Sequence, residues 1–408
     1  MFSIIPRRKT VAAVLNTLLL LLLPALAHAE WLAEPRVGGH FKTLNLLLEA
    51  PPADLGSSGE LSSNRLRLDF AGTLPGSVKG EFSVEDILLY TDPPSLAPLP
   101  GDSPNRRLDL EKDWNRGGRF AHQLFVDRLN LRAHLAGLDW TLGRQAVGFG
   151  RISLFSPLDI IAPFPPDALD TEVRPGVDAL RASRYFGMTG QAGAIAVFGQ
   201  GSDDNSYLAT LEGGPTGVDL LGIAGVLRER TMGGVGLATQ LFGMGLKGEL
   251  AWFEGRDPDR PGGDLHDDFA IAGLEADYRF DNGLILFTQY LHNGAGAGDP
   301  AAYPEALASA AVQEGLSFLL GRHYLLVAPS YQLHPLATVS GLLIWNLEDD
   351  SFLLRPLLDL SLSDNLALQL FWNLTHGAKP RQVFGLPIPR SEFGSASDSG
   401  GVFLKYFF

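Results

Sequence analysis

Apolar and polar residues alternate strictly along many short segments of this chain, and this pattern limits its fold more than any other feature. In residues 128–135 (RLNLRAHL) an apolar residue follows each polar one. Successive side chains of a β-strand point to opposite faces of a sheet, so such a segment forms a strand with one apolar and one polar face. The sequence therefore predicts an all-β protein with many amphipathic strands. The same alternation recurs in residues 65–70, 246–252, 274–280 and 366–375.

The alternation does not by itself tell which face is buried. In a soluble sandwich the apolar face packs inward, whereas in an outer-membrane barrel it contacts lipid and the polar face lines the lumen. After the first 29 residues, no segment offers the roughly 20 consecutive apolar residues of a transmembrane helix. If the chain crosses a membrane, it must do so as a closed barrel, because lipid offers no hydrogen-bond partner to an open sheet edge.

The first 29 residues differ from the rest of the chain. Three basic residues at positions 7–9 precede an apolar stretch over residues 11–27, and the small residues of Ala27-His28-Ala29 follow. This layout predicts a secretory signal peptide over residues 1–29, cleaved after Sec-type export. An uncleaved membrane anchor is the alternative, although the stretch is short for a span. No linker divides residues 30–408, which we expect to form one transmembrane β-barrel.

Charge and composition exclude several classes of function. The net charge of −14 would become −17 (−14 − 3) on loss of the three basic residues, so no nucleic acid is expected as a partner. The absence of Cys excludes disulfides, thiolate metal sites and C-x-x-C-H haem attachment. Neither H-E-x-x-H nor G-x-S-x-G occurs, and the acidic loop clusters lack EF-hand spacing. We expect no metal, no cofactor and no enzymatic activity, with a barrel hydrolase left as a less favoured alternative.

Turn signals divide the chain into about eighteen strands. Short turns such as Asp281-Asn282-Gly283 alternate with long connections near 91–119, 146–178 and 293–321. An even strand number, with short turns on one rim and long loops on the other, is typical of bacterial barrels. We therefore expect a single antiparallel barrel of about 16–18 strands, with short periplasmic turns and long extracellular loops. Residues 304–320 have helical character inside one long loop. The expected strands begin near 37, 62, 78, 120, 138, 179, 190, 205, 218, 233, 244, 269, 284, 322, 337, 352, 365 and 400.

The last nine residues, GGVFLKYFF, form an amphipathic strand that runs to the end of the sequence. Val402, Leu404, Tyr406 and Phe408 share one face, and Lys405 lies on the other. This ending resembles the C-terminal signature of Gram-negative outer-membrane barrels, a terminal aromatic with alternating hydrophobic residues before it. The resemblance implies recognition by the barrel-assembly machinery and a location in the bacterial outer membrane. An ordinary apolar last strand is the alternative.

A second resemblance covers about 45 residues. A strand over residues 139–146 (DWTLGRQA) leads into Val147-Gly-Phe-Gly150, and Ser156-Pro-Leu-Asp159 and Asp178-Ala-Leu-Arg181 follow. These segments are similar to those of porin-like barrels, including the alginate-export-like group, in which a G-R-Q strand end precedes a Pro- and Asp-rich loop. The resemblance does not specify a substrate.

The 146–178 loop is the most informative connection of the chain. Its apolar runs Ile152–Phe155 and Ile160–Phe164 favour burial over exposure to water. We therefore hypothesise that the loop folds into the lumen and narrows the pore, so that its charges and the wall charges create a transverse field. An external loop over the rim, or one packed on another subunit, is the alternative. The expected constriction-loop residues are Asp159, Asp170, Glu172, Arg174, Asp178 and Arg181. The expected pore-lining residues are Arg65, Arg67, Asp69, Arg128, Asn130, Arg132, Lys247, Glu249, Glu275, Asp277 and Arg279.

These observations favour a porin-like channel for the diffusion of small hydrophilic solutes. The alternative is the barrel component of an export or electron-transfer conduit, such as one for a polysaccharide. Expected partners are outer-membrane lipid, lipopolysaccharide and the barrel-assembly machinery. A homo-oligomer and a conduit partner that fills the lumen both stay open.

Overall fold

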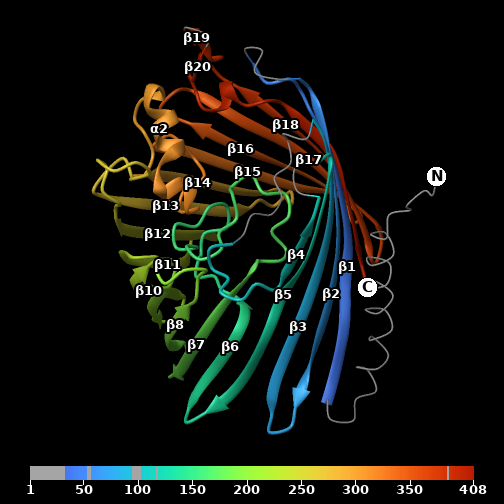
Figure 1. The fold of residues 1–408 in the computed structure, drawn as a ribbon, viewed down its shortest axis with the longest axis vertical. Coiled ribbons are helices and arrows are strands. Elements are labelled where there is room, and N and C mark those ends of the chain that lie inside the picture. The colour runs from blue at the N-terminus through green and yellow to red at the C-terminus, as the bar shows by residue number, and fades with distance from the viewer. Residues whose placement is uncertain (1–32, 53–56, 94–102, 116–117, 384–385) are drawn as a thin grey trace, which may run out of the picture.

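A computed structural model describes residues 33–52, 57–93, 103–115, 118–383 and 386–408. The expected signal peptide, residues 1–29, lies outside the described residues. The described part of the chain forms one barrel (Figure 1), whose eighteen strands each pair antiparallel with the next. The C-terminal strand pairs with the first, so the sheet is closed. The barrel strands are β1 (Ala33–Leu48), β2 (Gly59–Leu74), β3 (Val78–Asp92), β5 (Phe120–Leu135), β6 (Leu138–Ala146), β7 (Gly176–Phe186), β8 (Gly190–Val197), β9 (Ser206–Gly213), β10 (Val218–Leu227), β11 (Arg230–Leu241), β12 (Met244–Glu254), β13 (Asp268–Arg279), β14 (Ile285–Asn293), β15 (His323–His334), β16 (Ala337–Asn346), β17 (Ser351–Ser363), β18 (Leu366–His376) and β21 (Ser399–Phe407).

The long connections carry the remaining elements. Strand β4 pairs with β5 along residues 122–125, and β19 pairs with β20. Among the described residues, no helix is long and apolar enough to cross a membrane. The helical segment in the β14–β15 loop is shorter than residues 304–320, because Ser309 is extended and interrupts it. These elements are β4 (Glu111–Trp114), β19 (Arg381–Val383), β20 (Leu386–Ile388), the 3-10 helices η3 (Pro300–Ala302) and η4 (Phe393–Ser395), and the α-helices α2 (Tyr303–Ala308) and α3 (Ala310–Gln313).

The apolar face of the strands points outward. On β13, Leu274 is 65% exposed, whereas its neighbour Glu275 is 3% exposed and contacts chain inside the barrel. This arrangement decides between the two alternatives that the alternation left open, because a soluble sandwich would bury the leucine face. Exposed aromatic side chains gather toward both strand ends, as in the girdles of membrane barrels. They include Trp252, Tyr290, Trp345 and Trp372 near the long loops, and Tyr278, Tyr331 and Tyr406 near the short turns.

The expected all-β barrel and its strand order are confirmed. Each of the eighteen strands starts within about four residues of the expected position, because the turn residues interrupt the alternation sharply. The moderate connection expected near residues 229–232 is tighter in the structure. The β10–β11 link is a two-residue turn at Arg228 and Glu229, with left-handed φ angles of 48° and 67°. Two left-handed residues in succession are typical of the type I′ hairpin turn.

Candidate functional site

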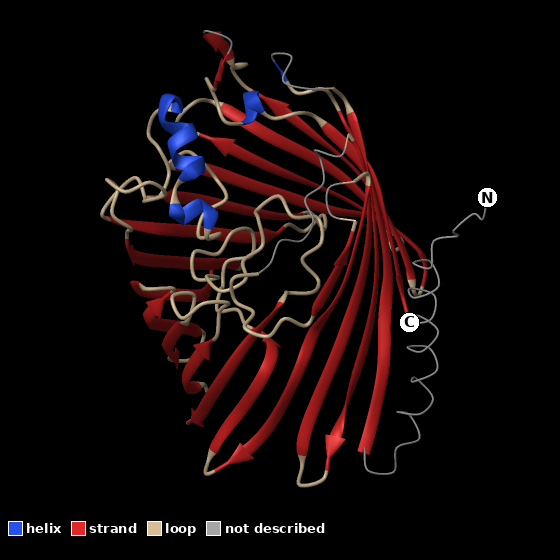
Figure 2. Cartoon of the chain, viewed as in Figure 1, coloured by secondary structure: helices blue, strands red, loops and turns tan. Residues whose placement is uncertain are grey.

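The loop between β6 and β7, residues 147–175, lies inside the ring of strands (Figure 2). Strands distant from β6 and β7 around the ring contact it with their inward-facing side chains. The contacts come from β9, β10, β12, β13 and β14 on one side, and from β1, β2, β17 and β21 on the other. We refer to residues 147–175 as the lumen loop.

A single carboxylate on β12 holds the first half of the lumen loop. Glu249 is buried and accepts hydrogen bonds from the backbone N–H groups of residues 151, 152 and 158. The Ser156 hydroxyl donates a further bond of 2.6 Å to the same carboxylate. Hydrogen bonds to an ionised acceptor are among the stronger ones in proteins. Glu249 therefore anchors the loop instead of facing an open lumen.

The next two strands continue this row of anchors. Glu275 of β13 accepts hydrogen bonds from the N–H groups of Ser153 (2.9 Å) and Leu154 (3.1 Å). Gln289 of β14 accepts from the N–H of Phe155 at 2.9 Å and donates to its carbonyl at 2.7 Å. The loop backbone thus finds the partners that a buried segment without regular structure requires.

Apolar packing reinforces the polar anchors. Leu158 is fully buried against β11, where a Cβ on Gly234 or Gly236 would crowd its methyl groups. Phe155 and Ile160 belong to the same buried cluster, together with inward-facing residues of strands β7 to β17. The apolar surface of the loop is therefore buried inside the barrel, and this half of the interior is filled by side chains.

The second half of the lumen loop presents carboxylates to the opposite wall. Lys42 of β1 binds Asp170 at 2.9 Å and Glu172 at 2.8 Å. Lys405 of β21 binds Glu172 at 2.8 Å, and Arg65 of β2 lies 3.6 Å from Asp170. Bound cations lower the pKa of both Asp170 and Glu172, although burial opposes them. Both groups are therefore ionised across the neutral pH range.

The base of the loop holds the residues that carry the porin-like resemblance. The guanidinium of Arg144 binds the carboxylate of Asp178 at 2.8 Å across the β6–β7 pair, where both side chains are buried. Gly143 has a φ of 111°, and a Cβ there would collide with the Leu129 carbonyl oxygen. The Gln145 amide donates to the Ala179 carbonyl. These residues hold the two strands together where the loop leaves the wall. Asp178 was expected among the constriction-loop residues, but its carboxylate pairs with Arg144 of the wall and lies apart from those of Asp170 and Glu172.

The expected wall arginines mostly pair with wall carboxylates. Asp127 binds Arg67 at 2.6 Å and Arg128 at 2.5 Å, and Arg67 also binds Asp69. Arg128 in addition donates to the carbonyl of Arg174 in the loop. Asp127, Lys42 and Lys405 complete the site but were not among the expected pore residues. The inward parity of Lys405 on the last strand was the available signal, whereas the bulge at Asp127 hid its orientation.

The other expected pore-lining residues occupy two environments. Asn130 is buried and donates to Glu81, and Lys247 binds Glu275 at 2.8 Å. Arg132 is half exposed beside Glu81, while Arg279 is exposed near the short turns. Asp277 lies 3.8 Å from Lys247. The residues of the expected assembly signal share the outer, lipid-side face, where Val402, Tyr406 and Phe408 are exposed and Leu404 is partly exposed.

Cavities lie on both sides of the lumen loop. One of about 700 Å³ separates the loop from Ala328 and Leu342 on β15 and β16, and is lined by Asp159, Arg174 and Arg181. A second, of about 470 Å³, lies toward the short turns and shares Arg181. Within the described part of the chain, Arg181 has no carboxylate in ion-pair range. Its guanidinium therefore borders both cavities without a carboxylate to neutralise it.

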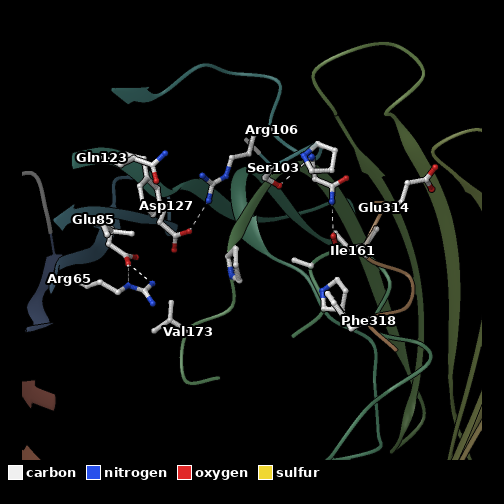
Figure 3. A pocket seen from close by; sticks show the side chains of 18 of the residues that line it. Arg65, Glu85, Ser103, Arg106, Gln123, Asp127, Ile161, Val173, Glu314 and Phe318 are labelled. Carbon is white, nitrogen blue, oxygen red and sulfur yellow. Dashed lines mark hydrogen bonds and ion pairs between the residues drawn. The ribbon is translucent and has the colours of Figure 1, made fainter. Parts of the chain in front are cut away.

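A third cavity, of about 430 Å³, lies between the loop, β2, β3 and β5 (Figure 3). Figure 3 shows Arg65 directed at Glu85 and Arg106 directed at Asp127 along one wall. Ile161 and other apolar side chains line the opposite wall. Paired acidic and basic groups on one wall therefore face an apolar wall across this cavity.

Asp159 gives the lumen loop a pH-sensitive charge. Burial raises the pKa of Asp159 to about 6, although Arg174 binds its carboxylate and opposes the shift. As the pH falls from 7 to 5, the carboxyl gains a proton and Arg174 loses its counter-charge. We expect the anion-to-cation permeability ratio to rise by roughly twofold over this range. Reversal potentials in a KCl gradient measure the ratio. Asp159→Asn should show the low-pH ratio at pH 7, and an unchanged titration in this variant would contradict the assignment.

Comparison with known proteins places this architecture among the porins. No protein-family model and no curated protein matches the chain. Among solved structures, OccD3 (OpdP) of Pseudomonas aeruginosa aligns over 94% of this chain and 96% of its own, at 10% identity and a TM-score of 0.54. OccAB4 of Acinetobacter baumannii aligns over 93% and 100%, at 10% identity and a TM-score of 0.56. A BenF-like porin from Pseudomonas fluorescens Pf-5 aligns over 93% and 99%, at 10% identity and a TM-score of 0.57. At such identities the likeness is one of fold, and the fold is that of outer-membrane porins.

Proposed function

We propose that this chain is an outer-membrane channel for the passive diffusion of small hydrophilic solutes. A barrel of eighteen strands is wide enough to enclose an aqueous passage. The observation that carries the proposal is the lumen loop, which is anchored to opposite walls and bordered by charged cavities. The loop limits solute size, and the unequal charges on its two sides select among polar solutes.

Solute uptake by vesicles tests this proposal. Liposomes that contain the folded chain should admit pentoses and hexoses and should exclude larger oligosaccharides, because the lumen loop narrows the passage. Swelling rates in iso-osmotic sugar solutions give the size limit. Liposomes with the heat-unfolded chain serve as the control. Equal swelling in both preparations would contradict a diffusion channel.

A conduit for polysaccharide or electron transfer remains the second candidate, on the strength of the alginate-export-like resemblance. The motif residues Arg144, Gln145 and Asp178 are engaged at the loop base, where they support the loop whatever passes through the barrel. A barrel that conducts only after addition of a periplasmic partner would favour the conduit.

The exposed C-terminal face supports a role in assembly. We propose that the barrel-assembly machinery recognises Val402, Leu404, Tyr406 and Phe408. Phe408→Ala should lower the amount of folded barrel in the outer membrane several-fold, as judged by heat-modifiable gel migration. Phe242→Ala removes an exposed aromatic from a short turn on the same rim and is the matched control. Equal amounts of the two variants would argue against the signal.

A further inference from the structure

Three connections of the long-loop rim meet at a cluster of polar side chains. Asn346, at the end of β16, donates hydrogen bonds of 2.8 Å to Glu392 and 2.9 Å to the hydroxyl of Tyr303. The Tyr303 hydroxyl in turn donates to Asp349 at 2.8 Å. The Tyr324 hydroxyl donates to Glu392 at 2.5 Å. Tyr303 belongs to α2, Asp349 to the β16–β17 turn and Glu392 to the connection before β21. We refer to these five residues as the rim cluster.

The rim cluster contains two carboxylates and no basic residue. Glu392 also accepts the backbone N–H of Leu320 at 2.9 Å, and its own N–H donates to Asp349 at 2.7 Å. The titratable groups that face Glu392 are the carboxylate of Asp349 and the hydroxyls of Tyr303 and Tyr324. Within the described part of the chain, no basic side chain lies in ion-pair range of either carboxylate. Two neighbouring carboxylates that lack a cation do not both ionise easily, because each charge disfavours the other.

The connection that carries α2, residues 294–322, packs against the lumen loop. The rings of Phe318 and Phe155 meet edge to face, with their centroids 6.3 Å apart. Leu316 and Leu319 belong to the same buried cluster as Phe155. Figure 2 shows the short helices of this connection (blue, upper left) at the rim beside the lumen loop. Release of this connection from the rim cluster would therefore loosen the packing around the lumen loop.

We propose that the rim cluster is a pH-dependent latch, which docks the β14–β15 connection against the lumen loop while Glu392 is protonated and loosens when Glu392 is ionised. A neutral Glu392 leaves a single negative charge in the cluster, on Asp349. An ionised Glu392 places two like charges in one site without a counter-ion, so the docked arrangement becomes less stable. The latch does not itself require a channel. Only its effect on transport rests on the proposed function, because a loosened connection widens the passage.

The direction of the switch follows from the environment of Glu392, which lies in a loop outside the barrel strands. Burial raises the pKa of Glu392 to about 7. The charge of Asp349 adds to this shift, whereas the hydrogen-bond donors around the carboxylate oppose it. In a released connection water surrounds the carboxyl, and its pKa returns to the ordinary 4.5. The docked state therefore retains a proton that the released state loses. Docking is strongest in acid and weakens as the pH rises through 7.

The labelling rate of a single buried cysteine in the folded full chain in detergent tests the latch. The native chain has no Cys, so Ala306→Cys in α2 carries the only thiol. Ala306 is fully buried, whereas the next residue, Leu307, is 54% exposed. The rate at which a maleimide modifies Ala306→Cys, divided by the rate for Leu307→Cys, measures release of the connection and cancels the pH dependence of the thiolate. We expect this ratio to rise by about tenfold or more from pH 5 to pH 8.

Two glutamine variants assign the pH dependence to Glu392. Glu392→Gln cannot ionise, so the ratio should stay at its low value at both pH 5 and pH 8. Glu348→Gln is the matched control. Glu348 lies in the same turn as Asp349, but its carboxylate is 3.7 Å from His323 and outside the rim cluster. This variant should keep the pH dependence of the native background.

A ratio that is the same at pH 5 and pH 8 in the native background, or a pH dependence that survives in Glu392→Gln, would overturn the inference. If Ala306→Cys is labelled as fast as Leu307→Cys already at pH 5, amide hydrogen exchange of residues 310–316 in the cysteine-free chain replaces the ratio. Protection should then be greater at pH 5 than at pH 8 after correction for the intrinsic rates, and equal protection would be contrary. Neither measurement needs a conducting pore. A chain that switches but admits no sugar would refute the channel and leave the latch standing.

Discussion

Replacement of residues 151–172 by a short Gly-Ser linker should raise the single-channel conductance at least about twofold. The lumen loop blocks part of the interior, and its removal leaves the wall intact. A short linker can close the strands because Ala146 and Gly176 are paired at the base of the loop. Single-channel recording in planar bilayers measures the change.

The control for this deletion is a loop of the same rim that does not cross the lumen. Removal of residues 257–263, at the exposed tip of the β12–β13 connection, should leave the conductance within experimental error of the native value. Equal conductance of the native chain and the lumen-loop variant would show that the loop does not limit the passage.

Glu249→Ala should release the first half of the lumen loop. Four donors lose their acceptor, and each buried donor left alone costs about 1–3 kcal/mol, so loop docking weakens by roughly 4 kcal/mol or more. The barrel itself should stay folded, because the strand hydrogen bonds are untouched. Arg151 lies in the released half of the loop, shortly after the end of β6, so trypsin should cut the variant after this residue. The channel current of the variant should also become noisy.

Glu81→Ala is the matched control for Glu249→Ala. Glu81 is also a glutamate on the inner wall, but it pairs with the half-exposed Arg132 and does not contact the loop. This variant should resist trypsin at Arg151 as the native chain does. Resistance of Glu249→Ala to the same degree would mean that the loop is held by its apolar packing alone.

The strands could be predicted from the sequence because each signal is local. Alternation fixes the face of a residue such as Leu274, and a turn such as Asp281-Asn282-Gly283 fixes where its strand stops. Because each strand pairs with the next one along the chain, the order of strands in the sequence is also their order in the barrel. The β10–β11 connection was expected near residues 229–232 but is shorter, because Arg228 and Glu229 are not typical turn residues and adopt a left-handed conformation between the two strands.

The site could be predicted only in part, because its contacts join residues far apart in the sequence. The Lys42–Asp170 pair spans 128 residues, and the Lys405–Glu172 pair spans 233. Parity placed Glu249 and Glu275 on the inner wall, but it could not show that the loop backbone covers them. The local sequence pattern predicts the face on which a residue lies, whereas its interaction partners depend on how the barrel closes.

The conductance of the refolded native chain in a planar bilayer, with its reversal potential in a KCl gradient, tests the central claim most directly. We expect steady, ohmic openings with a non-zero reversal potential, because an open lumen with unequal charges passes one ion type more readily. A folded, heat-modifiable barrel that never conducts would contradict the channel and would shift the assignment to a conduit that needs a partner.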